Sequence, residues 1–314
     1  AKGKRVLLAC FNVALGQDLH DAADRINDTE PGSVTAGHFH GLAIRFAREA
    51  GLADVPDYGD EHSDGAYYTD VLPDAMARAA DATGPRFDAV LIDEAQDFPG
   101  DFLTAILCHH TDPDDGEFHI FFDANQAIYT RSFAPPAGMV RCNLAENHRN
   151  PRTVCELLHS VCDTPITTRL RDSRPIERVA TDGAESLVKA TRRTLHRIIN
   201  EDAVPPGEVA ILTVRKAEDS ILAREDKLGN FRLHIGRPGS RRAPGKISLY
   251  SIHRFKGLES DVVLLIVEEP GHKPRQPLND LIYIGASRAR GHLVLLGREA
   301  TLHQLHEGAA AGVE

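Results

Sequence analysis

Two adjacent carboxylates at the end of an apolar run are the residues best suited to chemistry in this sequence. The run Ala89–Ile92 is followed directly by Asp93 and Glu94. A strand that ends in two carboxylates suits a Mg²⁺-nucleotide site, because one carboxylate can hold the metal while the other orients a water molecule. On its own the pair also fits an acidic turn on the surface, so its interpretation depends on the segments that follow.

A second apolar run also ends in polar residues. Residues 118–122 are followed by Asp123 and, three residues later, by Gln126. In an open sheet of parallel strands, ligands bind beyond the carboxyl ends of the strands. Both runs would deliver their polar groups to that edge, where the amide of Gln126 can donate to a terminal phosphate. The two runs together therefore favour a nucleotide site over a surface turn.

Several more apolar, β-branched runs alternate with longer helix-like segments. The runs are continuous, as expected for strands that are covered on both faces. This order predicts an α/β fold with mainly parallel sheets and helical crossovers. The predicted strands are 5–11, 88–92, 118–122, 209–214, 247–250, 261–267 and 292–296. The predicted helices are 38–50, 66–82, 98–109, 151–161, 184–200, 216–223, 278–288 and 299–307.

Length and composition indicate two domains. The chain has 314 residues, 42% of them apolar, and domains typically contain about 100–200 residues. No apolar stretch approaches the roughly 20 residues needed to cross a bilayer. The five cysteines form no Cys-x-x-Cys pair and the sixteen histidines show no zinc-site spacing, so neither a disulfide framework nor a structural zinc site is indicated. We expect a cytoplasmic protein that has no membrane partner.

The net charge gives only weak information about partners. A formal charge of −10 argues against a polyanion, because phosphate binding requires clustered Lys and Arg. Residues 54–74 and 112–117 are dense in acidic side chains, whereas 237–242 and 288–290 are locally basic. The basic segments fit either a nucleic-acid contact or a solvated loop.

Three further segments follow the two acidic runs. They are 144–151 (LAENHRNP), 251–259 (SIHRFKGLE) and 283–290 (YIGASRAR). In this order, together with the acidic runs, they resemble motifs II to VI of the superfamily 1 helicases of the UvrD/Rep type. Upstream, residues 6–12 look like the family's motif Ia, and residues 38–42 are similar to its Thr-Phe-His segment.

The resemblance implies an architecture of two RecA-like lobes. The first lobe would comprise residues 1–141 and would be truncated at its N-terminus, and the second would comprise 142–314. The nucleotide would lie in the cleft between the lobes, with single-stranded DNA across one face. Spacing between the motifs resembles that of a trimmed helicase core, such as those joined to an N-terminal nuclease-related domain.

The resemblance also assigns ATP and Mg²⁺ as cofactors and a set of residues to them. Asp93 would hold Mg²⁺, Glu94 would polarise the attacking water, and Gln126 would report the γ-phosphate. Arg149 and Arg288 match the two arginine fingers, which stabilise charge on the transferred phosphoryl group. The nucleotide base and ribose would contact His148, in the position of a stacking aromatic residue, Glu259, which would accept a ribose hydroxyl, and Gly257 of the same motif.

Seven residues match family positions that contact single-stranded DNA, or lie where the family has such a contact. Stacking of bases on aromatic rings is tolerant of sequence and suits movement along any strand. For the two phenylalanines of this set, core packing is an equally open alternative. The family often has a base-stacking Trp after the tyrosine of this set. Here Thr130 and Arg131 follow it; the guanidinium of Arg131 could stack on a base, but the missing Trp puts strand separation in doubt. The seven residues are Phe11, Asn12, Phe39, His40, Tyr129, Arg131 and His253.

The sequence contains no phosphate-binding loop of the Gly-x-x-x-x-Gly-Lys-Ser/Thr type. Residues 239–247 come nearest, but they have one residue too many, a proline, and isoleucine in place of the hydroxyl. We therefore expect a fragment of an ATP-dependent DNA helicase or translocase that is inactive by itself. The alternatives are a non-catalytic helicase-like module that binds nucleotide or protein and, less favoured, a two-metal nuclease site formed by Asp93, Asp97 and Asp123.

Overall fold

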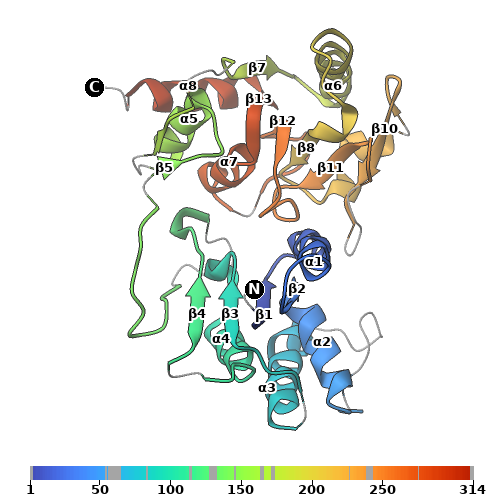
Figure 1. The fold of residues 1–314 in the computed structure, drawn as a ribbon. Coiled ribbons are helices and arrows are strands. Elements are labelled where there is room, and N and C mark those ends of the chain that lie inside the picture. The colour runs from blue at the N-terminus through green and yellow to red at the C-terminus, as the bar shows by residue number, and fades with distance from the viewer. Residues whose placement is uncertain are drawn as a thin grey trace. The chain divides into compact units, whose positions relative to one another are not determined.

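The chain forms two compact units, Ala1–Met139 and Val140–Glu314, and each contains its own α/β sheet (Figure 1). The computed structural model describes residues 3–53, 55, 65–82, 84–112, 115–126, 133–144, 146–162, 166–170, 174–225, 227–237, 243–274 and 276–311.

The sheet of the first unit has four parallel strands in the order β2-β1-β3-β4. Because all pairings are parallel, the carboxyl ends of the four strands lie at one edge of the sheet. The strands are β1 (Arg5–Cys10), β2 (Ser33–His38), β3 (Ala89–Ile92) and β4 (Glu117–Ile120), and the helices are α1 (Val13–Asn27), α2 (Phe39–Glu49), α3 (Leu72–Asp81) and α4 (Gly100–Leu107).

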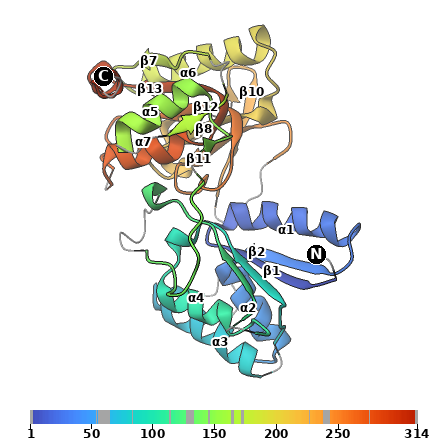
Figure 2. The same cartoon turned by 60° about the vertical axis from the view of Figure 1, so that its left-hand side comes forward.

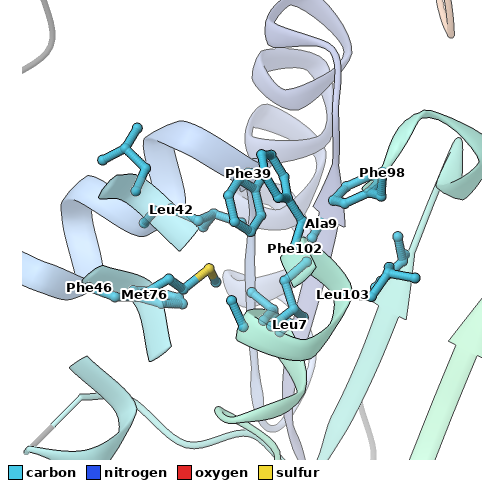
Figure 3. Packing of buried hydrophobic residues seen from close by; sticks show 14 of the residues in the cluster. Leu7, Ala9, Phe39, Leu42, Phe46, Met76, Phe98, Phe102 and Leu103 are labelled. Carbon is cyan, nitrogen blue, oxygen red and sulfur yellow. The ribbon is translucent and has the colours of Figure 1, made fainter. Parts of the chain in front are cut away.

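Helices cover both faces of this sheet, with α1 on one face and α2, α3 and α4 on the other (Figure 2). The core between the sheet and the three helices is rich in aromatic rings, and Figure 3 shows Phe39 packed against Phe102. Their ring centroids are 4.2 Å apart in a stacked arrangement. Phe39 directly follows the end of β2, so this core extends to the carboxyl edge of the sheet.

The second unit is built on a seven-stranded sheet in the order β7-β13-β12-β8-β11-β10-β9. Every pairing is parallel except that of β9 with β10. The central strands β8 and β11 are buried along their whole length. The strands are β7 (Glu177–Ala180), β8 (Val209–Thr213), β9 (Lys227–Leu228), β10 (Phe231–Ile235), β11 (Ile247–Ser251), β12 (Ser260–Ile266) and β13 (Ala289–Gly297).

The helices of the second unit are joined to a small extra sheet. Two short strands, β5 (Glu146–Asn147) and β6 (Thr167–Thr168), pair in parallel beside α5 (Arg152–Cys162). Helix α5 packs on α7 (Leu278–Ala286) and α8 (Glu299–Ala311), whereas α6 (Ala184–His196) packs near β9. These contacts bring the segment around β5 next to the end of α7.

The predicted α/β class with mainly parallel sheets is confirmed, and every predicted strand has an observed counterpart. Residues 216–223, predicted as a helix, instead form two short 3-10 turns. Helix α1 and strand β2 were not predicted. Among the described residues, no helix is both long and apolar enough to cross a membrane.

Helix α1 was not predicted because its packing requires a glycine inside the helix. A Cβ atom on Gly16 would lie 2.4 Å from the backbone nitrogen of His38, so only glycine allows α1 to approach the end of β2 this closely. Glycine normally weakens a helix interior by about 1 kcal/mol relative to alanine. The residue that the packing requires is therefore one that sequence patterns count against a helix.

Candidate functional site

The carboxyl edge of the first sheet gathers the predicted residues of this unit. Asn12 follows β1, His40 follows β2, Asp93 and Glu94 follow β3, and Gln126 lies beyond β4. Parallel pairing in register explains this gathering: Ala9 pairs with Ile92, for example, and Ile92 with Ile120. Strands far apart in sequence thus deliver their polar side chains to the same place.

The Asp93-Glu94 pair forms a tight turn directly after β3. The backbone nitrogen of Asp93 still donates to Ala9 O at 2.9 Å, so the sheet fixes this residue. Glu94 then adopts a left-handed conformation with φ 53°, which is uncommon for a residue other than glycine. Its backbone nitrogen donates to Asp93 Oδ1 at 2.9 Å. Both side chains are half-buried, so the turn directs two carboxylates to the partly solvated edge of the sheet.

A buried glutamine links Glu94 to the residues beyond β4. Gln96 is fully buried; its Nε2 donates to Glu94 Oε2 at 2.5 Å, and its Oε1 accepts from the Asp123 backbone nitrogen at 3.1 Å. Asp123 Oδ2 in turn accepts from Gln126 Nε2 at 2.8 Å. The predicted water-polarising carboxylate and the predicted phosphate sensor therefore belong to one hydrogen-bonded network. Gln96 was not predicted as a site residue, although its place two residues after Glu94 was a usable signal.

Cys10, at the end of β1, lies beside these carboxylates. Burial raises the pKa of its thiol well above the ordinary value, and the negative charges of Asp93 and Glu94 raise it further. A thiolate is disfavoured there for both reasons. Cys10 therefore remains a protonated packing residue at neutral pH.

The two phenylalanines predicted to contact DNA pack into the first core. Phe39 is fully buried, so it presents no ring face to a base in this structure. Phe11 is only partly buried and contacts the rings of Phe98 and Phe102, with centroids 5.7 and 6.3 Å away. Core packing, the alternative considered for both residues, describes Phe39 fully and Phe11 in part.

Asn12 and His40 have structural roles at the same edge. Asn12 caps helix α1, because its side-chain oxygen accepts from Ala14 N at 2.8 Å and Leu15 N at 3.3 Å. Burial lowers the pKa of His40 to about 4, which makes its ring neutral at physiological pH. Its imidazole packs against Tyr68, with ring centroids 5.2 Å apart.

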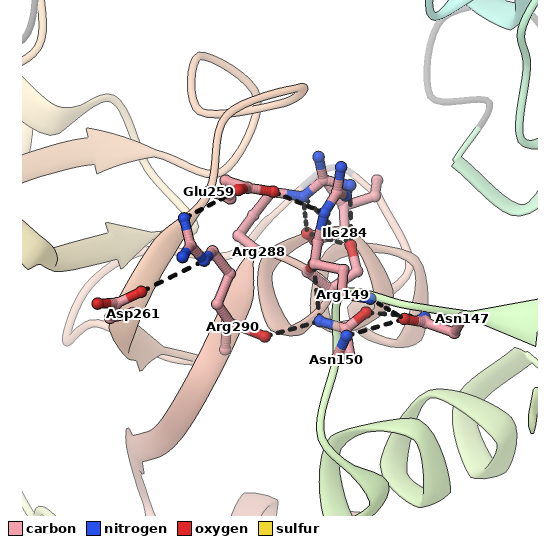
Figure 4. A network of polar contacts seen from close by, with 10 residues as sticks. Asn147, Arg149, Asn150, Glu259, Asp261, Ile284, Arg288 and Arg290 are labelled. Atoms are coloured by element: carbon pink, nitrogen blue, oxygen red, sulfur yellow. Dashed lines mark hydrogen bonds and ion pairs between the residues drawn. The ribbon is translucent and has the colours of Figure 1, made fainter. Parts of the chain in front are cut away.

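In the second unit, the segment after β5 is held by side-chain amides (Figure 4). Asn147 Oδ1 accepts from the backbone nitrogens of Arg149 and Asn150 at 2.9 and 2.8 Å. Asn150 Nδ2 donates to Ser287 O at 3.0 Å and to Ala289 O at 2.7 Å. The segment that carries Arg149 is therefore fastened to the segment that carries Arg288. Asn150 was not predicted as a site residue, and its type alone gave no signal.

Glu259 lies between two guanidinium groups. Arg149 Nε is 2.9 Å from Glu259 Oε2, and Arg290 Nη1 is 3.2 Å from Glu259 Oε1. Arg290 also pairs with Asp261 at 3.3 Å. Both oxygens of the carboxylate predicted to bind ribose thus interact with arginine in this structure.

The two predicted arginine fingers have different environments. The side chain of Arg149 is 41% exposed, whereas Arg288 is fully buried. Arg288 Nε donates to Ile284 O at 3.0 Å, and Nη2 donates to Ser287 Oγ at 2.9 Å. Arg288 is therefore fixed to the end of α7, while Arg149 is held mainly through its backbone and a partly exposed ion pair.

The remaining predicted residues of the second unit are spread over its surface and turns. His148 is largely exposed and lies 3.5 Å from Glu146. His253 Nε2 contacts Gln276 Oε1 at 2.5 Å, and burial lowers the pKa of His253. Gly257 has φ 82°, a conformation that favours glycine in the turn before β12. Two predicted residues of the first unit, Tyr129 and Arg131, lie outside the described residues.

The donor set at Asp93 fits Mg²⁺ better than it fits a closed metal cage. Mg²⁺ in nucleotide sites is usually bound by one or two carboxylates together with phosphates and water, and Asp93 is a half-buried carboxylate of that kind. In the described part of the chain, no three His, Cys, Asp or Glu side chains lie close enough to hold a metal by themselves. The two-metal alternative combines Asp93 with Asp97 and Asp123. Of these, Asp97 is only 2% exposed.

Comparison with known proteins gives one family match, to part of the second unit. Residues 246–296 match the model of the UvrD-like helicase C-terminal domain; this segment includes β11, β12, α7 and Arg288. Among solved structures, the C-terminal domain of a "possible DNA helicase" from Lactobacillus plantarum WCFS1 is 21% identical, with a TM-score of 0.35, and the match covers 48% of this chain and 87% of that one. No protein with a curated description matches the chain.

Proposed function

We propose that the chain is the core of a UvrD-like DNA helicase or translocase, which couples ATP hydrolysis to movement on single-stranded DNA. The observation that carries the proposal is the hydrogen-bonded network of Glu94, Gln96, Asp123 and Gln126 at the carboxyl edge of a parallel sheet. The family match over 246–296 supports it independently, because it lies in the other unit.

In this proposal each polar group at the first sheet edge has a chemical task. Asp93 would hold Mg²⁺, which when bound would neutralise charge on the phosphates. Glu94 orients the attacking water and accepts its proton. Gln126 donates to the terminal phosphate, and its link to Glu94 through Gln96 and Asp123 connects phosphate sensing to water activation.

The second unit supplies positive charge in the same proposal. Arg149 stabilises negative charge on the transferred phosphoryl group, a contribution that can reach about 10³–10⁵ in rate. Arg288 is fully buried in this structure, so its side chain would have to leave Ile284 O and Ser287 Oγ to do the same. Glu259 exchanges its ion pairs with arginine for the ribose hydroxyl. Such partly exposed ion pairs contribute only about 0–1 kcal/mol each, so the exchange is energetically accessible.

Single-stranded DNA is the proposed track. We assign this contact to His253 and to the ring of Phe11, both of which are only partly buried. Phe39 has no part in this contact, because it lies in the core.

The test is ATP hydrolysis by the natural full-length protein, with and without single-stranded DNA. We expect hydrolysis that DNA stimulates, and we expect Glu94→Gln to lower kcat by about 10²–10⁴-fold, as for loss of a general base. Asp101→Asn is the matched control, since Asp101 is an exposed carboxylate on α4. If the wild-type protein hydrolyses no ATP, or Glu94→Gln changes nothing, the proposal fails.

The alternative is a non-catalytic module that binds nucleotide or protein. The lack of a Gly-x-x-x-x-Gly-Lys-Ser/Thr segment in these 314 residues favours it. Binding of ATP without hydrolysis in the full-length protein, unaffected by Glu94→Gln, would select this alternative.

A further inference from the structure

Both polar groups of the Asn150 side chain form hydrogen bonds within the protein. Asn150 is 1% exposed. Its Nδ2 donates to Ser287 O and Ala289 O at 3.0 and 2.7 Å, and its Oδ1 accepts from Asn147 Nδ2 at 2.9 Å. An asparagine amide has two donor hydrogens and one acceptor oxygen. Each of these groups is therefore engaged.

These bonds connect the segments that carry two arginines distant in sequence. Asn150 directly follows Arg149, and the two carbonyls that it binds belong to the residues on either side of Arg288. The backbone of Asn150 is held as well, because its carbonyl accepts from Thr168 Oγ1 at 3.2 Å. One buried side chain thus sets the distance between the two arginine-bearing segments (Figure 4).

The ion pair of Arg149 restrains it less than the bonds of Asn150 do. Its ion pair with Glu259 joins side chains that are 41% and 39% exposed, and an exposed pair changes an equilibrium by less than about fivefold. Loss of a partner from a buried hydrogen bond changes an equilibrium by about 10-fold to 100-fold. The bonds of Asn150 therefore restrain this segment more strongly than the ion pair does.

We propose that Asn150 is a positioning residue that fixes the segment of Arg149 against the segment of Arg288, and that this placement lets Arg149 act on the transferred phosphoryl group. This inference rests on the proposed ATPase function for its consequence, although its geometry does not. Loss of the amide would let the Arg149 segment move away from Arg288, with each arginine still present. The catalytic benefit of Arg149 would then be lost without any change in its own side chain.

The geometric part is tested on the chain itself by amide hydrogen exchange. In Asn150→Ala, exchange at Arg149, Ser287 and Arg288 should become about 10-fold to 100-fold faster, while exchange in β8 stays as in the wild type. Asn143→Ala is the matched control, because Asn143 is exposed and its side chain bonds only locally, to Arg141. Its rates should stay within about twofold.

A second variant is used if Asn150→Ala unfolds the whole unit. If β8 loses protection in Asn150→Ala, Asn150→Ser is used instead, since serine retains one donor and less of the segment should be released. Unchanged exchange at Ser287 and Arg288 in a variant whose β8 remains protected would overturn the proposal.

The catalytic part is tested by a double-variant comparison in the full-length protein. Asn150→Ala should lower kcat for ATP by about 10-fold or more in the wild-type background, and should cost little further in the Arg149→Ala background. A merely structural role would lower kcat by the same factor in both backgrounds and would overturn the proposal. If the wild-type protein hydrolyses no ATP, the proposed function fails, and the exchange experiment still decides whether Asn150 joins the two segments.

Discussion

A buried side-chain amide joins two polar segments in each unit, but the two amides act on different partners. Gln96 bonds to a carboxylate oxygen of Glu94 and, 27 residues along the chain, to the backbone of Asp123. Asn150 bonds to backbone carbonyls 137 and 139 residues away. Gln96 therefore orients a side chain directly, whereas Asn150 fixes the backbone on which a charged side chain is mounted.

The difference follows from how each sheet delivers its residues. In the first unit, adjacent parallel strands already bring Glu94 and Asp123 to one edge, so only their side chains need to be aligned. In the second unit, Arg149 precedes α5, outside the main sheet, and strand register does not fix its place relative to Arg288. The side-chain hydrogen bonds of Asn150 to Ser287 O and Ala289 O fix the Arg149 segment relative to Arg288 instead.

The largest expected effect distinguishes the two arginines of the second unit. Arg288→Ala should lower the free energy of unfolding of this unit by about 3 kcal/mol, because it removes buried hydrogen bonds and leaves a cavity. Arg149→Ala should lower it by less than about 1 kcal/mol, because the side chain is 41% exposed. Urea denaturation followed by exchange at β8 measures both. Equal losses would show that burial does not separate the two residues.

A smaller effect is expected from Gln96 in the first unit. Gln96→Ala removes the fully buried amide and leaves the partly buried Asp123 N–H without its acceptor, which should cost about 2 kcal/mol in unfolding free energy. Asn27→Ala is the matched control: its amide also bonds to backbone, at Val34 N and O, but in an exposed position. The control should lose less than about 1 kcal/mol. Urea denaturation monitored at β1 compares them, and equal values would contradict a special role for the buried amide.

The smallest expected effect concerns acid stability of the first unit. Burial lowers the pKa of His38 and of His40 to about 4, below the ordinary value of 6.5. Between pH 6.5 and 4 the unfolded chain therefore binds more protons than the folded unit, and stability falls as the pH falls. His40→Phe removes one of these groups and retains a ring among aromatic neighbours. It should reduce the loss of unfolding free energy between pH 7 and 5.5 by about 1 kcal/mol.

The control for this experiment is His119→Phe, since His119 is exposed on β4. The same acid response in wild type and His40→Phe would mean that His40 titrates normally in the folded unit.

The sequence by itself determined the class of fold. It also indicated that the polar residues of the first unit gather at the carboxyl edge of its sheet. Continuous apolar runs predicted strands covered on both faces, and β8, β11 and β12 have that burial. Polar residues directly after such runs predicted that Asp93, Glu94 and Gln126 would meet. Both predictions rest on local properties of the chain, namely the apolar composition of a run and the position of a polar residue directly after it.

Other features were decided only by tertiary structure. Phe39 and Phe11 have the same residue type and similar positions after strands, yet only Phe39 is fully buried, because it lies over Phe102. Helix α1 exists around a glycine that only the nearby His38 backbone explains. The role of Asn150 depends on carbonyls more than 130 residues away. Sequence patterns report local spacing, whereas these features depend on contacts that form only when distant segments pack together.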